Sequence, residues 1–292
     1  MRRMNTFSWI FLLALGTGLL LQMWLAARQA AHIIAHADRV PAAFSDRITL
    51  QQHRKAASYS LARLAIERWE LALGALVLIG WTLTGGLDWL DRMIASAALP
   101  GLWEGVLLIL AVMLIGGLIE LPLSVWRTFG VEARFGFNHN TPAGFVKDKL
   151  LGILVTLVLG VPLIAVILWL MAAAGDYWWL WAWLVWMGFS LAVTWAYPIW
   201  IAPLFNKFEP LQDDTLRHRL EMLLQRCGFK SNGMFIMDGS RRSAHGNAYF
   251  TGFGANKRIV FFDTLLDGLE TDEVEAVLAH ELGHFKRRHI VK

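Results

Sequence analysis

The sequence predicts a multi-span α-helical membrane protein with a small α+β domain at its C-terminal end. Three observations lead to this fold class. The 292 residues are 56% hydrophobic with a mean hydropathy of +0.46, which is too apolar for an ordinary soluble domain. Five apolar runs are long enough for a bilayer crossing, which needs roughly 20 residues. After Pro203 the composition changes sharply, and shorter amphipathic segments follow.

The apolar runs define a predicted membrane region over residues 1–204. They lie at residues 7–27, 65–84, 102–125, 151–174 and 178–201. The first run follows Arg2 and Arg3, as a signal peptide would, but it is long and has no obvious small-residue cleavage site. We therefore expect it to be retained as a membrane helix.

The distribution of Lys and Arg predicts the orientation, because cytoplasmic loops are enriched in these residues. The first and third loops are rich in them, the second has only Arg92, and the fourth has none. The first and third loops and everything after the fifth span are therefore expected in the cytoplasm, although Arg2 and Arg3 then lie on the opposite side. These flanking charges also account for the pI near 9.4, so no nucleic-acid partner is expected.

Charged residues inside the spans need partners or water. Glu67 and Glu70 lie at the start of the second span, and Arg63 is placed four residues before Glu67 to form an ion pair on a helix. Glu120 comes late in the third span, just before Pro122, which is expected to kink that helix. Glu120 either faces the protein interior or already lies in the interface region, and the sequence leaves both open.

Residues 205–292 predict the α+β domain. Asp213 or Asp214 can cap a helix that carries leucines on one face, and Gly228 can end it. A last helix is expected to begin near Thr271. Short strands are expected at 234–237, 248–253 and 258–262, with a turn over 254–257 between the last two.

The most specific motif is His280-Glu281-Leu282-Gly283-His284, an H-E-x-x-H pattern. Two histidines four residues apart share one face of a helix, so both imidazoles can bind one Zn²⁺. Glu281 lies beside them and can take a proton from water. A surface helix with two solvated histidines is the weaker interpretation, because a small sheet followed by such a helix is typical of zincin-type metalloproteases.

A zinc site of this type needs a third protein ligand, and the sequence offers no convincing one. The extended metzincin pattern would place Gly and His where this chain has Arg287 and Ile290. Glu273 and Glu275 precede the motif by at least a helical turn and are unattractive ligands. The chain stops at Lys292 inside a helix-like pattern, so the domain is expected to continue beyond it.

A peptide substrate of such an enzyme pairs its backbone with a sheet edge near the metal. The strand expected to make this pairing consists of Asn247, Ala248, Tyr249 and Phe250. The sequence does not exclude the alternative that these residues form an ordinary core strand.

Five blocks of sequence together are far more specific than the zinc motif alone. They are residues 129–141, 197–208, 238–250, 257–265 and 280–284. In residues and order they resemble the Ste24-type CAAX prenyl proteases, integral-membrane zinc metallopeptidases of the M48 group. The similarity extends from about the second span to the end of the chain.

This resemblance implies a helical chamber of seven spans, of which five are present here, with the catalytic site facing inward and toward the cytoplasm. It implies one Zn²⁺ held by His280, His284 and a Glu beyond Lys292, with Glu281 as the general base. Asn247 resembles a residue that contacts the substrate near the scissile bond. The implied partners are the lipid bilayer and a peptide or protein substrate, prenylated in eukaryotic relatives.

Bacterial members of the family suggest a different role, in quality control of membrane proteins. The composition, rich in Ala, Leu, Trp and Arg, favours a bacterial inner membrane over the endoplasmic reticulum.

Three rival hypotheses make different predictions. The smaller stress-linked M48 membrane proteases have fewer spans than the five predicted here. A transporter or channel would show internal repeats across the spans, and none is evident. A truncated or inactive fragment with a structural or partner-binding role would bind no stoichiometric zinc and would lose nothing on mutation of Glu281.

Overall fold

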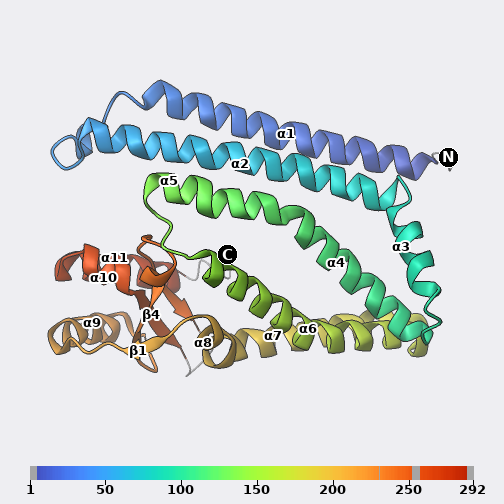
Figure 1. The fold of residues 1–292 in the computed structure, drawn as a ribbon. Helices are drawn as coiled ribbons and strands as arrows, with labels where there is room; N and C mark the ends of the chain where they lie inside the picture. The colour runs from blue at the N-terminus through green and yellow to red at the C-terminus, as the bar shows by residue number, and fades with distance from the viewer. Residues whose placement is uncertain (1–4, 230, 252–256, 288–292) are drawn as a thin grey trace. The chain divides into compact units, whose positions relative to one another are not determined.

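The structure is a computed structural model that describes residues 5–229, 231–251 and 257–287. It consists of two compact units, Met1–Gly136 and Phe137–Lys292 (Figure 1). Long helices make up the first unit, and the second combines two long helices with a small sheet and its covering helices. The helices of the first unit are α1 (Thr6–His36), α2 (Leu50–Thr82), α3 (Gly86–Ala95), α4 (Gly101–Val125) and α5 (Ala133–Phe135).

The described helices confirm the predicted membrane fold class. Four helical stretches are long and apolar enough to cross a membrane: Thr6–His36, Gly101–Phe135, Pro142–Ala173 and Gly175–Phe205. A fifth crossing arises if α2 and α3, which are bent by 55° at the break between them, are taken together. The first half of α2 carries several charged residues, which lowers its hydropathy below that of the other spans.

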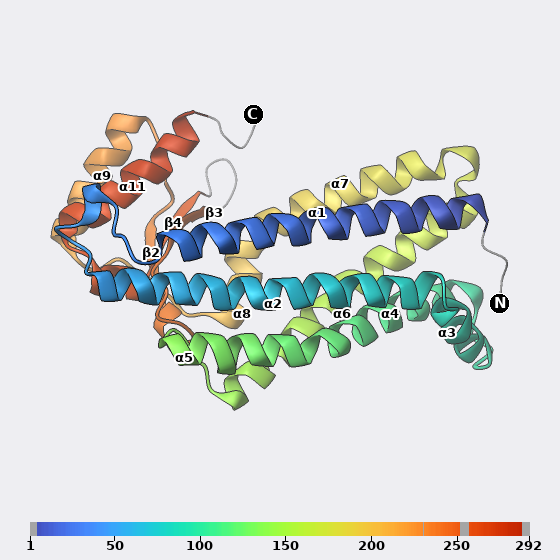
Figure 2. The same cartoon turned by 90° about the horizontal axis from the view of Figure 1, so that it is seen from above.

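The first two helices are longer than their apolar runs. They lie side by side along much of their length, as Figures 1 and 2 both show. The segment predicted as the first loop is therefore mostly helical, and only residues 37–49 connect α1 to α2. Thr49 explains where α2 begins: its hydroxyl accepts from the Gln52 backbone N–H at 3.2 Å, and the Gln52 side chain accepts from the Thr49 N–H at 2.9 Å.

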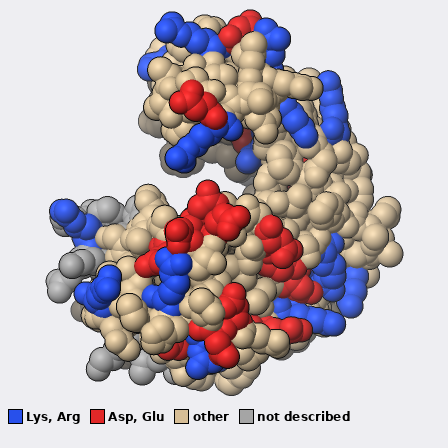
Figure 3. Space-filling view, turned by 90° about the vertical axis from the view of Figure 1, so that its left-hand side faces the viewer, with Lys and Arg blue, Asp and Glu red and all other residues tan. Residues whose placement is uncertain are grey.

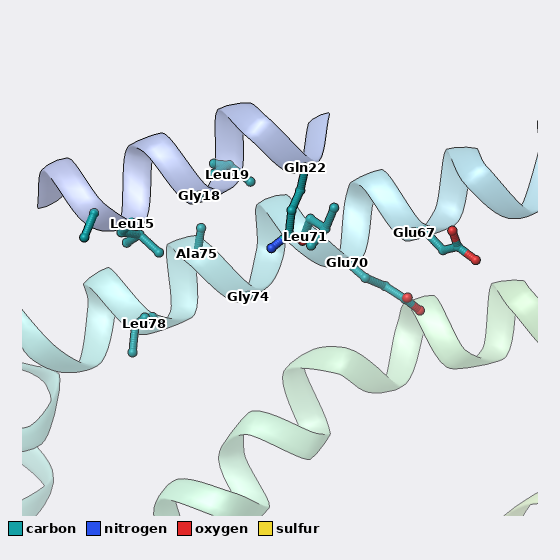
Figure 4. A pocket seen from close by; sticks show the side chains of 11 residues that line it. Leu15, Gly18, Leu19, Gln22, Glu67, Glu70, Leu71, Gly74, Ala75 and Leu78 are labelled. Atoms are coloured by element: carbon teal, nitrogen blue, oxygen red, sulfur yellow. The ribbon is translucent and has the colours of Figure 1, made fainter. Parts of the chain in front are cut away.

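The carboxylates at the start of the second span have partners within the first unit. Arg63 pairs with Glu67 at 3.7 Å, as the four-residue spacing predicts. In Figure 4 the Glu70 side chain points from α2 toward a neighbouring helix. Its carboxylate accepts from Arg127 at 2.5 Å. A groove of about 700 Å³ lies between α1 and α2 beside these carboxylates. Glu120 is exposed in α4.

The end of α4 departs from regular helical geometry after Pro122, which lies inside the helix. The backbone widens into a π-helical segment over Trp126–Glu132 before the short helix α5. Proline removes one backbone donor, and neighbouring residues accommodate this loss by such local widening. Gly136 then ends the unit with φ of +83°, a conformation that costs little only for glycine.

The second unit begins with an antiparallel pair of long helices and continues into the sheet. The π-helical segment Tyr197–Ile201 connects α7 to α8. The helices are α6 (Pro142–Ala173), α7 (Trp178–Ala196), α8 (Ala202–Phe205), α9 (Asp214–Cys227), α10 (Asp263–Gly268) and α11 (Thr271–Lys286). The strands are β1 (Phe208–Pro210), β2 (Met234–Met237), β3 (Ala248–Thr251) and β4 (Arg258–Phe262).

The four strands form one sheet in the order β1-β2-β4-β3. β2 and β4 are parallel, and the two outer pairs are antiparallel. The predicted strands at 234–237 and 258–262 have the expected bounds, and β3 begins at the expected residue. The predicted turn over 254–257 falls almost wholly on residues outside the described part. β1 was not predicted, because three residues ending in Pro210 carry no alternating pattern.

One face of the sheet is covered by α9 and α11, whose apolar faces build the core of this unit. Asp213 caps α9 by accepting from the Leu216 N–H at 3.0 Å, and Gly228 ends the helix with φ of +67°. The core side chains are Leu211, Leu216, Leu220, Leu224, Phe229, Met234, Ala248, Ile259, Phe261, Val274, Leu278 and Leu282.

Candidate active site

The helix that carries the H-E-x-x-H motif is held by a stripe of buried apolar residues. Val274, Leu278 and Leu282 recur every four residues along α11, and each is at most 1% exposed. They pack against α9 and against β3 and β4 in the unit's core. Full burial of three such side chains stabilises this helix by several kcal/mol, on the order of 2 kcal/mol each. The stripe therefore determines which face of α11 points away from the core.

The N-terminal end of α11 is held by charges. The Glu273 side chain accepts from the backbone N–H of Glu270 at 3.0 Å. Arg219 of α9 donates to Glu275 at 2.6 Å and to Asp272 at 2.7 Å. The two glutamates judged unattractive as metal ligands therefore have other roles, in capping the helix and in joining it to α9. On the face shown in Figure 3, acidic and basic side chains lie interspersed around these elements.

The two histidine positions of the motif lie on the side of α11 that faces away from the core, whereas Leu282 between them belongs to the buried stripe. Position 280 is about 200° around the helix from Leu278, and position 284 follows one turn later. His280 is exposed and Glu281 is half-buried. The side chain of His284 lies outside the described part of the structure, although its backbone continues α11. The helix thus presents the two histidine positions on one face, as the motif requires.

The donor set fits a zinc ion as far as it is described. Two imidazoles one helical turn apart are a common pair of zinc ligands. Among the described side chains, which do not include that of His284, no group of three or more His, Cys, Asp or Glu could hold a metal.

The predicted substrate strand is an edge strand. β3 lies at the end of the strand order and pairs only with β4 among the described residues. The Phe262 N–H donates to Asn247 O at 2.9 Å, so in this antiparallel register the backbone groups of Ala248 and Phe250 point away from β4. The Asn247 side chain accepts from the Ala248 N–H at 2.9 Å.

The side chains of β3 anchor it from both faces. Ala248 is in the core with α11, and Phe250 packs against that core. Tyr249 is on the opposite face and packs edge-on against Phe262 at 6.2 Å between ring centroids. Burial, with a smaller contribution from Tyr197, raises the pKa of the Tyr249 phenol to about 12, so it stays neutral at physiological pH. Among the described residues, β3 is therefore a packed strand that also lies at the edge of the sheet.

The loop before β3 is fixed at one side by Asp263. Its carboxylate accepts from the Ser240 hydroxyl and, at 2.8 Å, from the backbone N–H groups of Ser240 and Thr264. Burial alone would raise the pKa of Asp263, but these hydrogen bonds outweigh it and hold the pKa below its ordinary value. The Thr264 hydroxyl in turn donates to His245 O at 2.9 Å.

At the other side the loop is fixed by Arg242, which sequence reasoning missed as a functional group. Its guanidinium donates to both oxygens of Asp148 at 2.6 and 2.8 Å, to the Asn206 side chain at 2.6 Å and to Phe205 O at 2.6 Å. The residues come from three separate parts of the sequence, at 148, 205–206 and 242, so only the fold brings them together. The one signal in the sequence was that Phe205, Asn206 and Arg242 fall within blocks 197–208 and 238–250, whereas Asp148 falls within none.

The segment that opens the second unit pairs with the same loop. Asn138 and Ser243 form an isolated antiparallel bridge, and the Ala244 N–H donates to Phe137 O at 3.0 Å. The rings of Phe137 and His245 are stacked, with centroids 4.2 Å apart and an interplanar angle of 17°. Phe137 and Asn138, in the part of this block that belongs to the second unit, therefore support the loop that leads into β3.

Comparison with known families assigns both parts of this chain. The family described as "CAAX prenyl protease N-terminal, five membrane helices" matches residues 29–207. "Peptidase family M48" matches residues 210–292 and so includes β2, β3, β4 and α11.

Individual relatives agree with this. A "CAAX prenyl protease 1 homolog" of Oryza sativa subsp. japonica is 43% identical over 62% of this chain and 43% of its own length. A protein of the same description from Mus musculus is 32% identical over 98% of this chain and 68% of its own. The chain spans about half the length of most of the curated relatives it matches.

A solved structure is similar over the whole chain. The crystal structure of S. mikatae Ste24p matches with a TM-score of 0.90 at 28% identity, covering 100% of this chain and 69% of that one.

Proposed function

Because this chain belongs to the M48 peptidases with a CAAX-prenyl-protease N-terminal region, we propose that it is a membrane-embedded zinc metalloendopeptidase. Residues 205–292 are assigned to the protease domain and residues 1–204 to the membrane region. The observation that carries the proposal is the packing of the H-E-x-x-H helix α11 against the edge strand β3.

The proposed roles follow from the chemistry of the side chains. His280 and His284 hold one Zn²⁺ through imidazole nitrogens. When bound, zinc supplies a Lewis acid that polarises the scissile carbonyl and lowers the pKa of water. Glu281 accepts the proton of the attacking water and passes it to the leaving amide nitrogen. We assign the third protein ligand to no residue of this chain.

The substrate is proposed to be a peptide that adds to the sheet as a strand beside β3. The outward-facing backbone groups of Ala248 and Phe250 support this mode, because an open edge offers hydrogen bonds to any extended backbone. Asn247 lies at the same edge, where its side chain holds the Ala248 N–H and could instead contact the substrate. Tyr249 positions the strand from the opposite face.

Three finer assignments, of the substrate, the orientation and the host membrane, are also proposals. The relatives are named CAAX prenyl proteases, so a prenylated C-terminal segment is the narrower substrate class, with membrane-protein quality control as the alternative. The protease domain faces the cytoplasm, on the basis of the Lys and Arg distribution. Composition favours a bacterial inner membrane, but the relatives reported above are eukaryotic and do not support that choice.

The test compares zinc content and peptide cleavage in the purified, detergent-solubilised chain. Wild type is expected to hold close to one zinc per chain, and His280→Ala and His284→Ala are expected to lose it. Glu281→Gln is expected to keep zinc and lose cleavage, because it removes only the proton acceptor. His218→Ala is the matched control, since it removes an exposed histidine from α9 in the same domain.

The expected outcome would also exclude the hypothesis that the chain is an inactive fragment. A wild-type chain without stoichiometric zinc, or cleavage that survives Glu281→Gln, would overturn the proposed function.

A further inference from the structure

A cavity of about 370 Å³ lies within the second unit, between the start of α6 and the short helix α8. It is separate from the face of α11 that carries the zinc motif, and none of the proposed site residues lines it. Its lining is Asn140, Thr141, Gly144, Lys147, Asp148, Pro203, Leu204, Phe205, Asn206, Lys207, Arg241 and Arg242.

The charges in this cavity are strongly unequal. Four basic side chains line it, against the single carboxylate of Asp148. Arg242 neutralises that carboxylate and uses its remaining donors on Asn206 and Phe205 O, so it forms part of the wall. Within the part of the chain that the structure describes, neither Lys147 nor Lys207 forms an ion pair. Arg241 pairs with Asp238, which is outside the lining, at 3.6 Å. The positive charge that the cavity offers to an anion is therefore mainly that of Lys147 and Lys207.

An apolar groove adjoins the cavity along α6 and shares Lys147 with it. It is about 750 Å³ and is lined by Pro142, Ala143, Val146, Lys147, Leu150, Leu151 and Leu154. The exposed fractions of Val146, Leu150 and Leu154 are 54%, 61% and 55%. The basic cavity and the apolar groove meet at Lys147. Together they suit a ligand that has an anionic headgroup for the cavity and an apolar chain for the groove.

The topology places the pair of cavities at a membrane surface. α6 and α7 form a helical hairpin, so the start of α6 and the end of α7 lie at the same end of it (Figure 1). Both helices belong to stretches apolar enough to span a bilayer, and the second stretch ends at Phe205, which lines the cavity. The phosphate groups of phospholipids lie at this depth, and basic pockets beside membrane helices bind them.

We propose that this cavity binds the phosphate of an anionic phospholipid, with an acyl chain lying along α6 on Val146, Leu150 and Leu154. Lys147 and Lys207 supply the charge that selects an anionic headgroup. Arg242 and Asp148 hold the wall in place. The bound lipid would join the start of α6 to the loop that leads into β3, through Arg241 and Arg242.

The test measures the apparent Kd for phosphatidylglycerol by native mass spectrometry of the full 292-residue chain in neutral detergent. Lys147→Gln with Lys207→Gln removes two cationic groups from the cavity and is expected to weaken binding about thirtyfold. Lys55→Gln with Lys149→Gln is the matched control, because it removes the same charge from exposed positions outside the cavity. The control is expected to bind as wild type does. The readout is independent of zinc and of cleavage, so it tests this site separately from the proposed function.

Three further measurements, with an arginine variant, with phosphatidylcholine and with inorganic phosphate, test the proposal. Lys147→Arg with Lys207→Arg keeps the charge and is expected to restore binding, which separates loss of charge from loss of fold. Equal weakening in the cavity variant and the control would overturn the proposal, as would equal affinity for zwitterionic phosphatidylcholine. Displacement of phosphatidylglycerol by an equal concentration of inorganic phosphate would also overturn it, since the acyl chain would then contribute nothing to binding.

Discussion

Arg242 and Asp148 lie 94 positions apart in the sequence, and Arg242 donates to both carboxylate oxygens at 2.6 and 2.8 Å. Their side chains are 23% and 26% exposed, so solvent screens the pair only partly. This two-point contact between guanidinium and carboxylate, called the fork below, joins the first turns of α6 to the loop before β3. The strand proposed to bind substrate is therefore held by a contact with the membrane helix.

Arg242→Lys is expected to destabilise the chain by about 2–3 kcal/mol, because lysine cannot make the forked contact and leaves Asp148 without its second donor. The loss should appear as a lower thermal unfolding midpoint in detergent. Asp38→Asn is the control: it breaks the Arg54–Asp38 pair, whose side chains are 57% and 77% exposed, and should cost less than about 1 kcal/mol. Equal effects of the two changes would contradict a structural role for the fork.

Asp263 is expected to make the folded chain less stable as the pH falls. Its pKa in the folded chain lies below the ordinary value, so its contribution is present above the unfolded-state pKa and is lost as pH falls through the folded-state pKa. Asp263→Asn should cost about 1 kcal/mol at pH 7, because the charge-assisted hydrogen bonds to Ser240 weaken.

The check is the difference in unfolding midpoint between wild type and Asp263→Asn, measured from neutral pH to below about pH 4. The difference should shrink as the pH falls. Asp267→Asn, at an exposed position of the same helix, serves as the control and should show a small difference throughout. A difference in unfolding midpoint that stays constant with pH would mean that the carboxylate charge does not organise the loop.

Leu278 is fully buried opposite the zinc motif, and Leu278→Ala should destabilise the chain by about 2–5 kcal/mol through the cavity it leaves. Zinc content should fall with stability, because α11 carries both the apolar stripe and the histidines. Met222→Ala on α9, where the side chain is 41% exposed, should cost little. Normal zinc content and stability in Leu278→Ala would show that the stripe does not position the motif.

Backbone pairing with β3 can be tested through the substrate. An N-methyl group on the substrate nitrogen that faces Ala248 or Phe250 removes one hydrogen bond and should lower kcat/KM by up to about tenfold. The same group on the adjacent residue faces away from β3 and is the matched control. Cleavage that responds equally to both peptides would argue against strand addition at this edge.

Local sequence determined the helices and the strands with clear patterns. The apolar runs placed the membrane helices, and Asp213 and Gly228 marked the ends of α9. The spacing within the motif placed His280 and His284 one turn apart on one helix. These features depend on residues near each other in the chain, because hydrophobic periodicity, caps and helical spacing act over a few residues.

Contacts between distant residues were decided only by the tertiary structure. The sequence left open whether β3 would be an edge strand or an ordinary core strand, and it did not indicate that β1 would form or that Arg242 would meet Asp148. Each depends on which segments the core brings together. β1, for example, exists through its pairing with β2 rather than through any propensity of Phe208–Pro210. Pairing partners are chosen by packing of the whole unit, so they cannot be read from a local pattern.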